Sequence, residues 1–244
     1  TKKWGVPASL LQLTRLCYPH LPAILPAFEE RAHFMWIGNF RHAPNADALP
    51  WICQEIWPAI RARLPQAEFH IYGAYSIKQL EHLHRPPDGV KMLGSCESAW
   101  DTLKKYRVSL SPLRFGAGIK GKISDSWYSG TPVVTTPIGA EGMTAHLPFG
   151  GVVAETPADL AKAAIQLYTS EEKFLQMRDR GYALIREVFP LRAQFNQLRT
   201  DIHSLIENLS QRRQTNAVGN ILWLNTLRST EYFSRWIEEK KKNR

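Results

Sequence analysis

The sequence lacks the marks of several protein classes. Its three cysteines, Cys17, Cys53 and Cys96, are widely spaced and odd in number, which argues against a disulfide framework and against a zinc site. No apolar run approaches the roughly 18 to 20 residues of a membrane span, and the first residues do not have the layout of a signal peptide. We also find no internal repeat and no low-complexity tract. These absences indicate a globular protein of the reducing cytoplasm.

Acidic residues are also in short supply. The chain has 22 acidic and 31 basic residues, a formal net charge of +9. Residues 211–244 carry eight of the basic and three of the acidic residues, so this tail supplies +5 of the total. The body is therefore only mildly basic, which argues against a nucleic-acid-binding face and fits a phosphorylated partner. With 244 residues, 44% of them hydrophobic, the chain can bury a sizeable core.

Short apolar runs alternate with helical patterns along most of the chain. Pro50 is expected in the first turn of one predicted helix, where its missing N–H costs little. The alternation predicts an α/β fold, a Rossmann-like parallel sheet with helices on both faces, followed by C-terminal helices. We predict strands at 33–38, 68–72, 90–93, 108–111, 133–136 and 151–154, and helices at 45–64, 77–83, 99–106, 157–168, 171–188 and 191–209, with a further helix ending near Gly130.

Three regions follow from this reading. Residues 1–32 contain Pro7, Pro19, Pro22 and Pro26, too many prolines for a long helix, and are expected to be a lead-in or linker. Residues 33–210 are predicted to form the Rossmann-like domain. Residues 211–244 are predicted to form a basic helical tail, with a polar hinge at 211–219 and a helix at 221–237.

A glycine-rich loop between a predicted strand and a predicted helix is the strongest functional signal. Gly116, Gly118 and Gly121 allow the backbone to approach a ligand closely, and the N-terminus of the following helix supplies partial positive charge. Arg114, Lys120 and Lys122 add full charges. The loop is therefore predicted to bind a phosphate group, in particular a diphosphate.

The same loop matches two other patterns incompletely. The dinucleotide fingerprint would need an early position in the chain and an acid after the next strand, which here ends in Thr135 and Thr136. The P-loop pattern would need Ser or Thr where Ile123 stands, and that hydroxyl would hold magnesium. A glycine-rich surface turn with solvated lysines is the remaining alternative.

Four separated blocks carry a resemblance to a known family. Residues 38–48, 56–58, 114–122 and 132–143 resemble the C-terminal half of a GT-B glycosyltransferase of the family-4 type, and the likeness covers about 33–190. The resemblance implies a nucleotide-sugar-binding domain that acts with retention of configuration, without an obligatory metal or a cofactor. It also implies polysaccharide biosynthesis, a glycan, lipid-linked or other acceptor, and an N-terminal acceptor domain in the parent protein.

The resemblance also implies roles for single residues. Of the family's two acids, the one that holds ribose hydroxyls falls on Asp125, whereas the one that touches the donor sugar falls on Ala117. The family's basic residues near the first strand fall on Asn39 and Pro44, so other cations must face the diphosphate. His42 is expected to hydrogen-bond the donor phosphate or sugar, or to be structural.

These inferences define one predicted site without assigned catalytic residues or metal ligands. The open alternatives to a transferase are a non-catalytic sugar-nucleotide-binding module and a dinucleotide-dependent oxidoreductase. The predicted substrate and diphosphate residues are Gly38, Asn39, Arg41, His42, Arg114, Gly116, Gly118, Ile119, Lys120, Gly121 and Lys122, with Asp125 for the ribose.

The tail has the composition of an amphipathic helix. Its basic end could anchor it to an anionic membrane at the cytoplasmic face, which would suit a lipid-linked acceptor. Packing against the body or against the acceptor domain is the other interpretation. The predicted apolar face consists of Ile221, Leu222, Tyr232, Phe233, Trp236 and Ile237.

Overall fold

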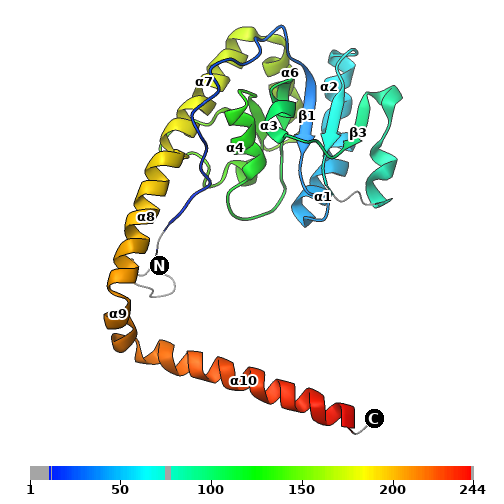
Figure 1. The fold of residues 1–244 in the computed structure, drawn as a ribbon. Helices are drawn as coiled ribbons and strands as arrows, with labels where there is room; N and C mark the ends of the chain where they lie inside the picture. Colours follow the sequence, from blue (N-terminus) through cyan, green and yellow to red (C-terminus); the bar gives the residue numbers. More distant parts are fainter. Residues whose placement is uncertain (1–10, 12, 75–77, 243–244) are drawn as a thin grey trace. The chain divides into compact units, whose positions relative to one another are not determined.

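A six-stranded parallel sheet forms the centre of the protein. The computed structural model describes residue 11, residues 13–74 and residues 78–242 (Figure 1). The strand order is β3-β2-β1-β4-β5-β6, and every neighbouring pair is parallel, which confirms the predicted α/β Rossmann-like fold. The strands are β1 (Ala32–Ile37), β2 (Phe69–Tyr72), β3 (Val90–Gly94), β4 (Tyr106–Leu110), β5 (Val133–Thr135) and β6 (Gly151–Val153).

Helices connect the strands and continue after the last one. Several are short, and three segments are not α-helical: the π-helix η2 (Ile52–Ile56) and the 3-10 helices η3 (Lys78–Leu83) and η4 (Pro86–Asp88). The α-helices are α1 (Ala43–Trp51), α2 (Trp57–Arg63), α3 (Ala99–Leu103), α4 (Gly121–Tyr128), α5 (Pro137–Ala140), α6 (Pro157–Thr169), α7 (Glu171–Glu187), α8 (Leu191–Glu207), α9 (Leu209–Thr215) and α10 (Ala217–Lys242).

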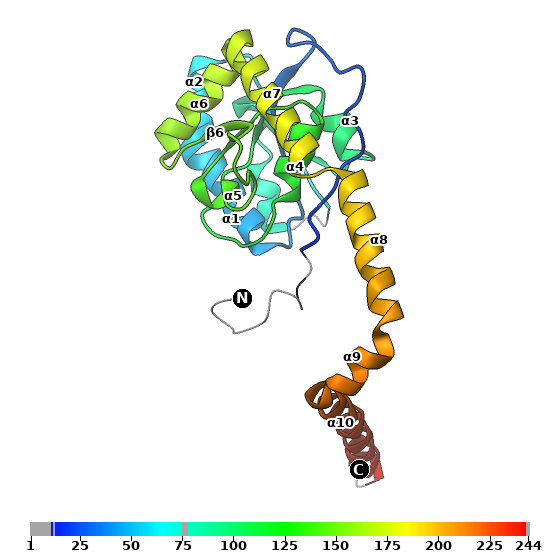
Figure 2. The same cartoon turned by 90° about the vertical axis from the view of Figure 1, so that its left-hand side faces the viewer.

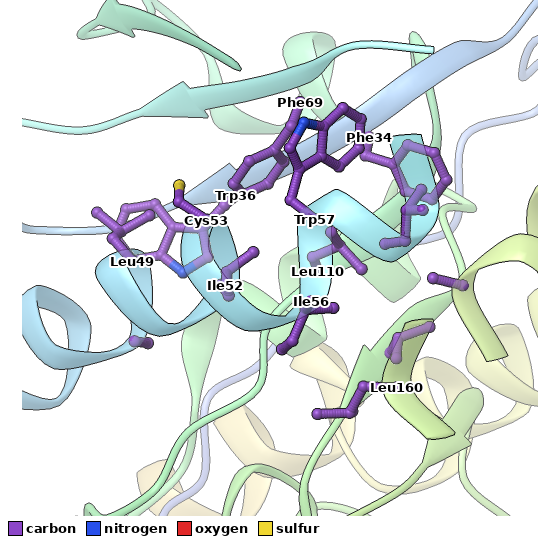
Figure 3. Close-up of a cluster of buried hydrophobic side chains, with 14 of the residues drawn as sticks. Phe34, Trp36, Leu49, Ile52, Cys53, Ile56, Trp57, Phe69, Leu110 and Leu160 are labelled. Carbon is purple, nitrogen blue, oxygen red and sulfur yellow. The ribbon is translucent and has the colours of Figure 1, made fainter. Parts of the chain in front are cut away.

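The two faces of the sheet contact different helices. Alternate residues of a strand point to opposite faces, so Phe34 and Trp36 lie in one buried cluster and Met35 lies in another. The larger cluster joins β1 to α1, α2 and α6, and Figure 3 shows its aromatic centre. Helices α3, α4 and α7 lie on the other side (Figure 2). Burial on both faces explains the apolar strand sequences.

The helical segment between β1 and β2 differs from the predicted helix in the position of Pro50. The expected first-turn position was wrong, because α1 already begins at Ala43 and Pro44 occupies the first turn. Pro50 lies inside α1, where it removes one backbone donor, and the chain then passes through η2 before α2. The predicted single helix at 45–64 is therefore three consecutive segments.

The lead-in contacts the domain at defined points. Residues 1–10 and residue 12 of the predicted lead-in lie outside the described residues. Tyr18 is 5% exposed, forms a β-bridge with Pro190, and donates its amide to the carbonyl of Phe189 at 2.9 Å. Arg31 is completely buried just before β1. The lead-in thus contributes two buried side chains to the domain.

The chain divides into two compact units, Thr1–Gln194 and Phe195–Arg244. In the second unit the break that the predicted hinge at 211–219 implies is confined to Asn216, between α9 and α10, and the other residues of this range are helical. Arginine and glutamine are good helix formers, so polarity alone did not indicate a loop.

The predicted apolar face of the tail is exposed. Whether this face contacts a membrane or packs against protein stays a prediction. No helix among the described residues is long and apolar enough to cross a membrane.

Candidate functional site

The predicted glycine-rich loop borders a cavity at the carboxyl ends of β1 and β4. The cavity has a volume of about 270 Å³. Part of the predicted site lines it, together with four residues that the predicted site did not include, namely Pro44, Asn45, Leu113 and Ala117. The lining residues are Gly38, His42, Pro44, Asn45, Leu113, Gly116, Ala117, Ile119, Lys120, Gly121 and Lys122.

The cavity contains the N-terminus of α4. Lys120 is the N-cap residue, and its side chain forms no capping hydrogen bond with the first turn. The first backbone N–H groups of a helix have no partner within the helix, so an uncapped N-terminus attracts an anion. The preceding loop depends on glycine, because Gly116 and Gly118 have φ values of 137° and 76°, which other residues rarely adopt.

Lys120 lines the cavity and carries a charge without a hydrogen-bond partner among the described residues. The residue is only 7% exposed, and among the described residues its Nζ has no hydrogen-bond partner. Burial lowers the pKa of Lys120, and the nearby carboxylate of Glu141 offsets part of that effect. An enclosed ammonium group without a partner is unfavourable, and an anionic ligand would supply the missing hydrogen bonds.

Lys122 is held differently, between an amide and an indole. Its Nζ donates to Asn45 Oδ1 at 2.6 Å and lies 4.4 Å from the centre of the Trp36 ring. Burial lowers the pKa of Lys122 to about 7, although the residue as a whole is only partly buried. Asn45 also donates to the carbonyl of Asn39 at 2.9 Å, so one amide connects Lys122 to the end of β1.

Gly38 allows this arrangement to form. A Cβ atom at residue 38 would lie 2.8 Å from both Asn45 Nδ2 and Trp36 Cη2, closer than real side chains approach. Sequence reasoning identified Gly38 but missed Asn45. The signal that could have identified Asn45 was its polar side chain in the first turn of α1, the helix that follows β1 and Gly38.

The other predicted residues do not line the cavity. Arg114 forms a two-pronged ion pair with Asp47, with Nε to Oδ2 at 2.9 Å, and this contact raises the pKa of Arg114. The Oδ1 atom of Asn39 accepts a hydrogen bond from the backbone amide of Arg41 at 2.8 Å. Arg41 and Gly118 are exposed. Of the predicted basic residues, Lys120 and Lys122 are therefore those that line the cavity in the described part of the chain.

Asp125 lies one turn into α4 and does not line the cavity. Its Oδ1 atom accepts hydrogen bonds from the Tyr18 hydroxyl and from Trp100 Nε1, both at 2.8 Å. Gly121 and Asp125 are four residues apart, so they share one face of the helix. No group of three or more His, Cys, Asp or Glu among the described residues is arranged to hold a metal ion.

A family model gives the clearest comparison. The model of glycosyl transferases group 1 matches residues 31–170, more than half of the chain, and the chain belongs to this family. The match confirms the resemblance to a GT-B glycosyltransferase domain. A comparison with curated protein sequences gave no match.

Solved structures share the fold at low sequence identity. TarM from S. aureus, crystallised with UDP, has a TM-score of 0.57 at 16% identity, over 74% of this chain and 36% of TarM. The pneumococcal O-GlcNAc transferase GtfA, in complex with UDP and GlcNAc, has a TM-score of 0.60 at 16% identity, over 75% and 38%. Anabaena HepE, in complex with UDP and glucose, has a TM-score of 0.57 at 15% identity, over 73% and 50%. The chain thus matches half or less of each protein.

Proposed function

We propose that the chain is the donor-binding half of a glycosyltransferase. It would bind a nucleoside-diphosphate sugar, whose sugar passes to a glycan, lipid-linked or other acceptor with retention of configuration. Family membership supports nucleotide-sugar transfer. The likeness to between 36% and 38% of the length of two transferases supports the proposal that a separate domain binds the acceptor. The parent protein would supply an acceptor-binding domain.

One observation carries the proposal: Lys120, which lines the cavity and is the N-cap residue of the uncapped helix α4, has an ammonium group without a hydrogen-bond partner among the described residues. Both features favour the same ligand, because a diphosphate can accept hydrogen bonds from Lys120 and from the first amides of the helix. The cavity of about 270 Å³ is small, which suits a diphosphate group and leaves the rest of the nucleotide outside it.

The same contacts would assist the reaction. When the bond between sugar and diphosphate breaks, negative charge grows on the leaving oxygen while the sugar acquires oxocarbenium character. Lys120 and the helix N-terminus are fixed in a partly enclosed site, where electrostatic stabilisation of such charge is strong. We assign Asp125 to the ribose, since it lies one turn beyond the cavity residue Gly121. UDP is our first choice of nucleotide, because the similar TarM, GtfA and HepE were crystallised with it.

Ala117 favours a second candidate, a sugar-nucleotide-binding module without transferase activity. This residue lines the cavity at the position where the resemblance places an acid that contacts the donor sugar. A methyl group cannot accept hydrogen bonds from sugar hydroxyls. Nucleotide binding without sugar transfer by the full-length protein would favour this candidate over the transferase.

Isothermal titration calorimetry of this chain with UDP, GDP and ADP tests the binding function. We expect at least one of them to bind with a dissociation constant below about 1 mM, within the usual range for enzyme substrates. The uncharged nucleoside serves as the control and should bind much more weakly, because it lacks the diphosphate. Absence of detectable binding of all three nucleotides at millimolar concentration would contradict the proposal.

Nucleotide binding should weaken as the pH rises through the neutral range. The pKa of Lys122 is about 7 in the ligand-free protein, and a nearby diphosphate would raise it. Binding would therefore be coupled to proton uptake by Lys122, and affinity would fall above pH 7 by up to about tenfold per pH unit. Titrations at pH 7, 8 and 9 measure this slope, above the second phosphate pKa of about 6.

Two variants test whether the pH dependence of nucleotide affinity arises from Lys122. Lys122→Arg keeps the charge at every pH of the series and should flatten the slope. His42 also lines the cavity, so His42→Gln serves as the matched control and should keep the slope. A slope that survives in Lys122→Arg would assign the proton to another group, and we would then reject this role for Lys122.

A further inference from the structure

We propose that Tyr18 and Trp100 are positioning residues that orient the carboxylate of Asp125 towards the ribose of the bound nucleotide. The inference rests on the proposed function, in which Asp125 binds ribose hydroxyls. It adds two residues that come from separate parts of the chain, the lead-in and the start of α3. Neither residue lines the diphosphate cavity.

Both donors bind the same oxygen of the carboxylate. The Tyr18 hydroxyl and Trp100 Nε1 each lie 2.8 Å from Asp125 Oδ1. Tyr18 also lies 2.8 Å from Ser124 Oγ, but it has a single proton, and the charged carboxylate is the stronger acceptor. The hydroxyl of Ser124 has its own acceptor in the carbonyl of Gly121 at 3.0 Å. The Tyr18 proton is therefore assigned to Asp125.

The other oxygen of Asp125 remains available. No hydrogen bond to Oδ2 is present among the described residues, and the residue is only partly buried. Ionised carboxylates accept hydrogen bonds through both oxygens, so Oδ2 can accept bonds from sugar hydroxyls while Oδ1 is occupied. Asp125 follows Gly121 by one helical turn, a rise of about 6 Å, and a ribose is joined directly to the diphosphate that we place at Gly121.

Packing fixes the two donors before any ligand binds. Tyr18 is 5% exposed, its ring lies 5.4 Å from that of Tyr128, and its carbonyl accepts the amide of Leu191 at 3.1 Å. The Trp100 ring lies 4.5 Å from Tyr128. Burial, and next the charge of Asp125, raise the pKa of Tyr18, so its hydroxyl keeps its proton. A carboxylate that is already held by the buried Tyr18 hydroxyl and by Trp100 Nε1 loses little freedom when a ribose binds.

The test compares UDP with 2′,3′-dideoxyuridine 5′-diphosphate, which lacks both ribose hydroxyls. The ratio of their affinities, measured by calorimetry, reports the ribose contact apart from the diphosphate contact. We expect a ratio of about tenfold or more for the unmodified chain, and a ratio near one for Asp125→Ala, which has no group that can bind a hydroxyl. Tyr18→Phe and Trp100→Phe, which keep an aromatic ring, should each lower the ratio at least threefold without weakening binding of the dideoxy compound.

A double-variant cycle separates positioning from general packing. In the Asp125→Ala background, Tyr18→Phe should have no further effect on UDP affinity, whereas a packing defect would weaken binding of both nucleotides in either background. Unchanged ratios in both aromatic variants would overturn the inference. A ratio near one for the unmodified chain would overturn it together with the ribose assignment, while leaving the diphosphate site intact. If neither nucleotide binds, the proposed function itself fails.

Discussion

Replacing Lys120 with methionine is expected to weaken UDP binding by about 100-fold and to stabilise the ligand-free protein. Hydrogen bonds to charged groups contribute about 1.5 to 3 kcal/mol each, and each 1.4 kcal/mol corresponds to tenfold in affinity. The Lys120 ammonium has no hydrogen-bond partner among the described residues, and the attraction of Glu141 offsets only part of the cost of its burial. Methionine keeps most of the length of the side chain without a buried charge. We therefore expect a gain of about 1 kcal/mol in the free energy of unfolding.

Calorimetry and chemical denaturation measure these two effects on the same preparation. Lys162→Met is the matched control, because Lys162 is exposed on α6, outside the cavity lining. It should leave UDP affinity within about twofold and stability within about 0.5 kcal/mol. Unchanged UDP affinity in Lys120→Met would remove Lys120 from the diphosphate site. A loss of both affinity and stability would indicate a structural role for this lysine.

Replacing Arg31 with methionine is expected to destabilise the domain by about 3 to 5 kcal/mol, because three acceptors lose their donor and each unsatisfied buried group costs roughly 1 to 3 kcal/mol. Arg31 is fully buried and ties the end of the lead-in to the segment between α4 and β5. It donates to Pro26 O at 3.0 Å, to Thr131 Oγ1 at 2.9 Å and to Ser129 O at 3.1 Å. Burial lowers the pKa of Arg31 to about 10, and its guanidinium lies 5.6 Å from the Phe174 ring. Methionine would fill similar volume but would leave the carbonyl oxygens without donors.

Thermal unfolding measures this effect, because each kcal/mol lowers the midpoint of a domain of this size by roughly 2 to 4 °C. Arg186→Met is the control, since Arg186 is exposed on α7, and it should change the midpoint by no more than about 2 °C. The unfolding midpoint of Arg31→Lys should lie between those of Arg31→Met and Arg186→Met, because lysine keeps the charge but lacks the planar guanidinium with its several donors. A midpoint for Arg31→Met equal to that of the control would show that its hydrogen bonds do not stabilise the lead-in.

The fold could be predicted from the sequence because each strand and most helices have a local signature. Strand β1, for example, is a continuous apolar run, as expected for a parallel strand buried on both faces. The glycine-rich loop was also a local signal, and its position between β4 and α4 agrees with the prediction. Pro50 was misplaced because its helix begins earlier than its apolar spacing indicated.

The contacts within the site could not be read from the sequence in the same way. Lys122 is 77 residues from Asn45, and Tyr18 is 107 residues from Asp125. Periodicity reports the neighbours of a residue on its own helix or strand, whereas these partners meet only when the sheet has formed. Charge counting therefore grouped Arg114 with Lys120 and Lys122, although Arg114 pairs with Asp47 and does not line the cavity.

A crystal structure of this chain with UDP tests the central claim most directly. The account predicts the diphosphate at the N-terminus of α4, with an oxygen within about 3 Å of Lys120 Nζ and others bonded to the first amides of the helix. It also predicts a ribose hydroxyl on Asp125 Oδ2. A diphosphate bound elsewhere, with Lys120 still unpartnered, would contradict the assignment of this cavity to the donor.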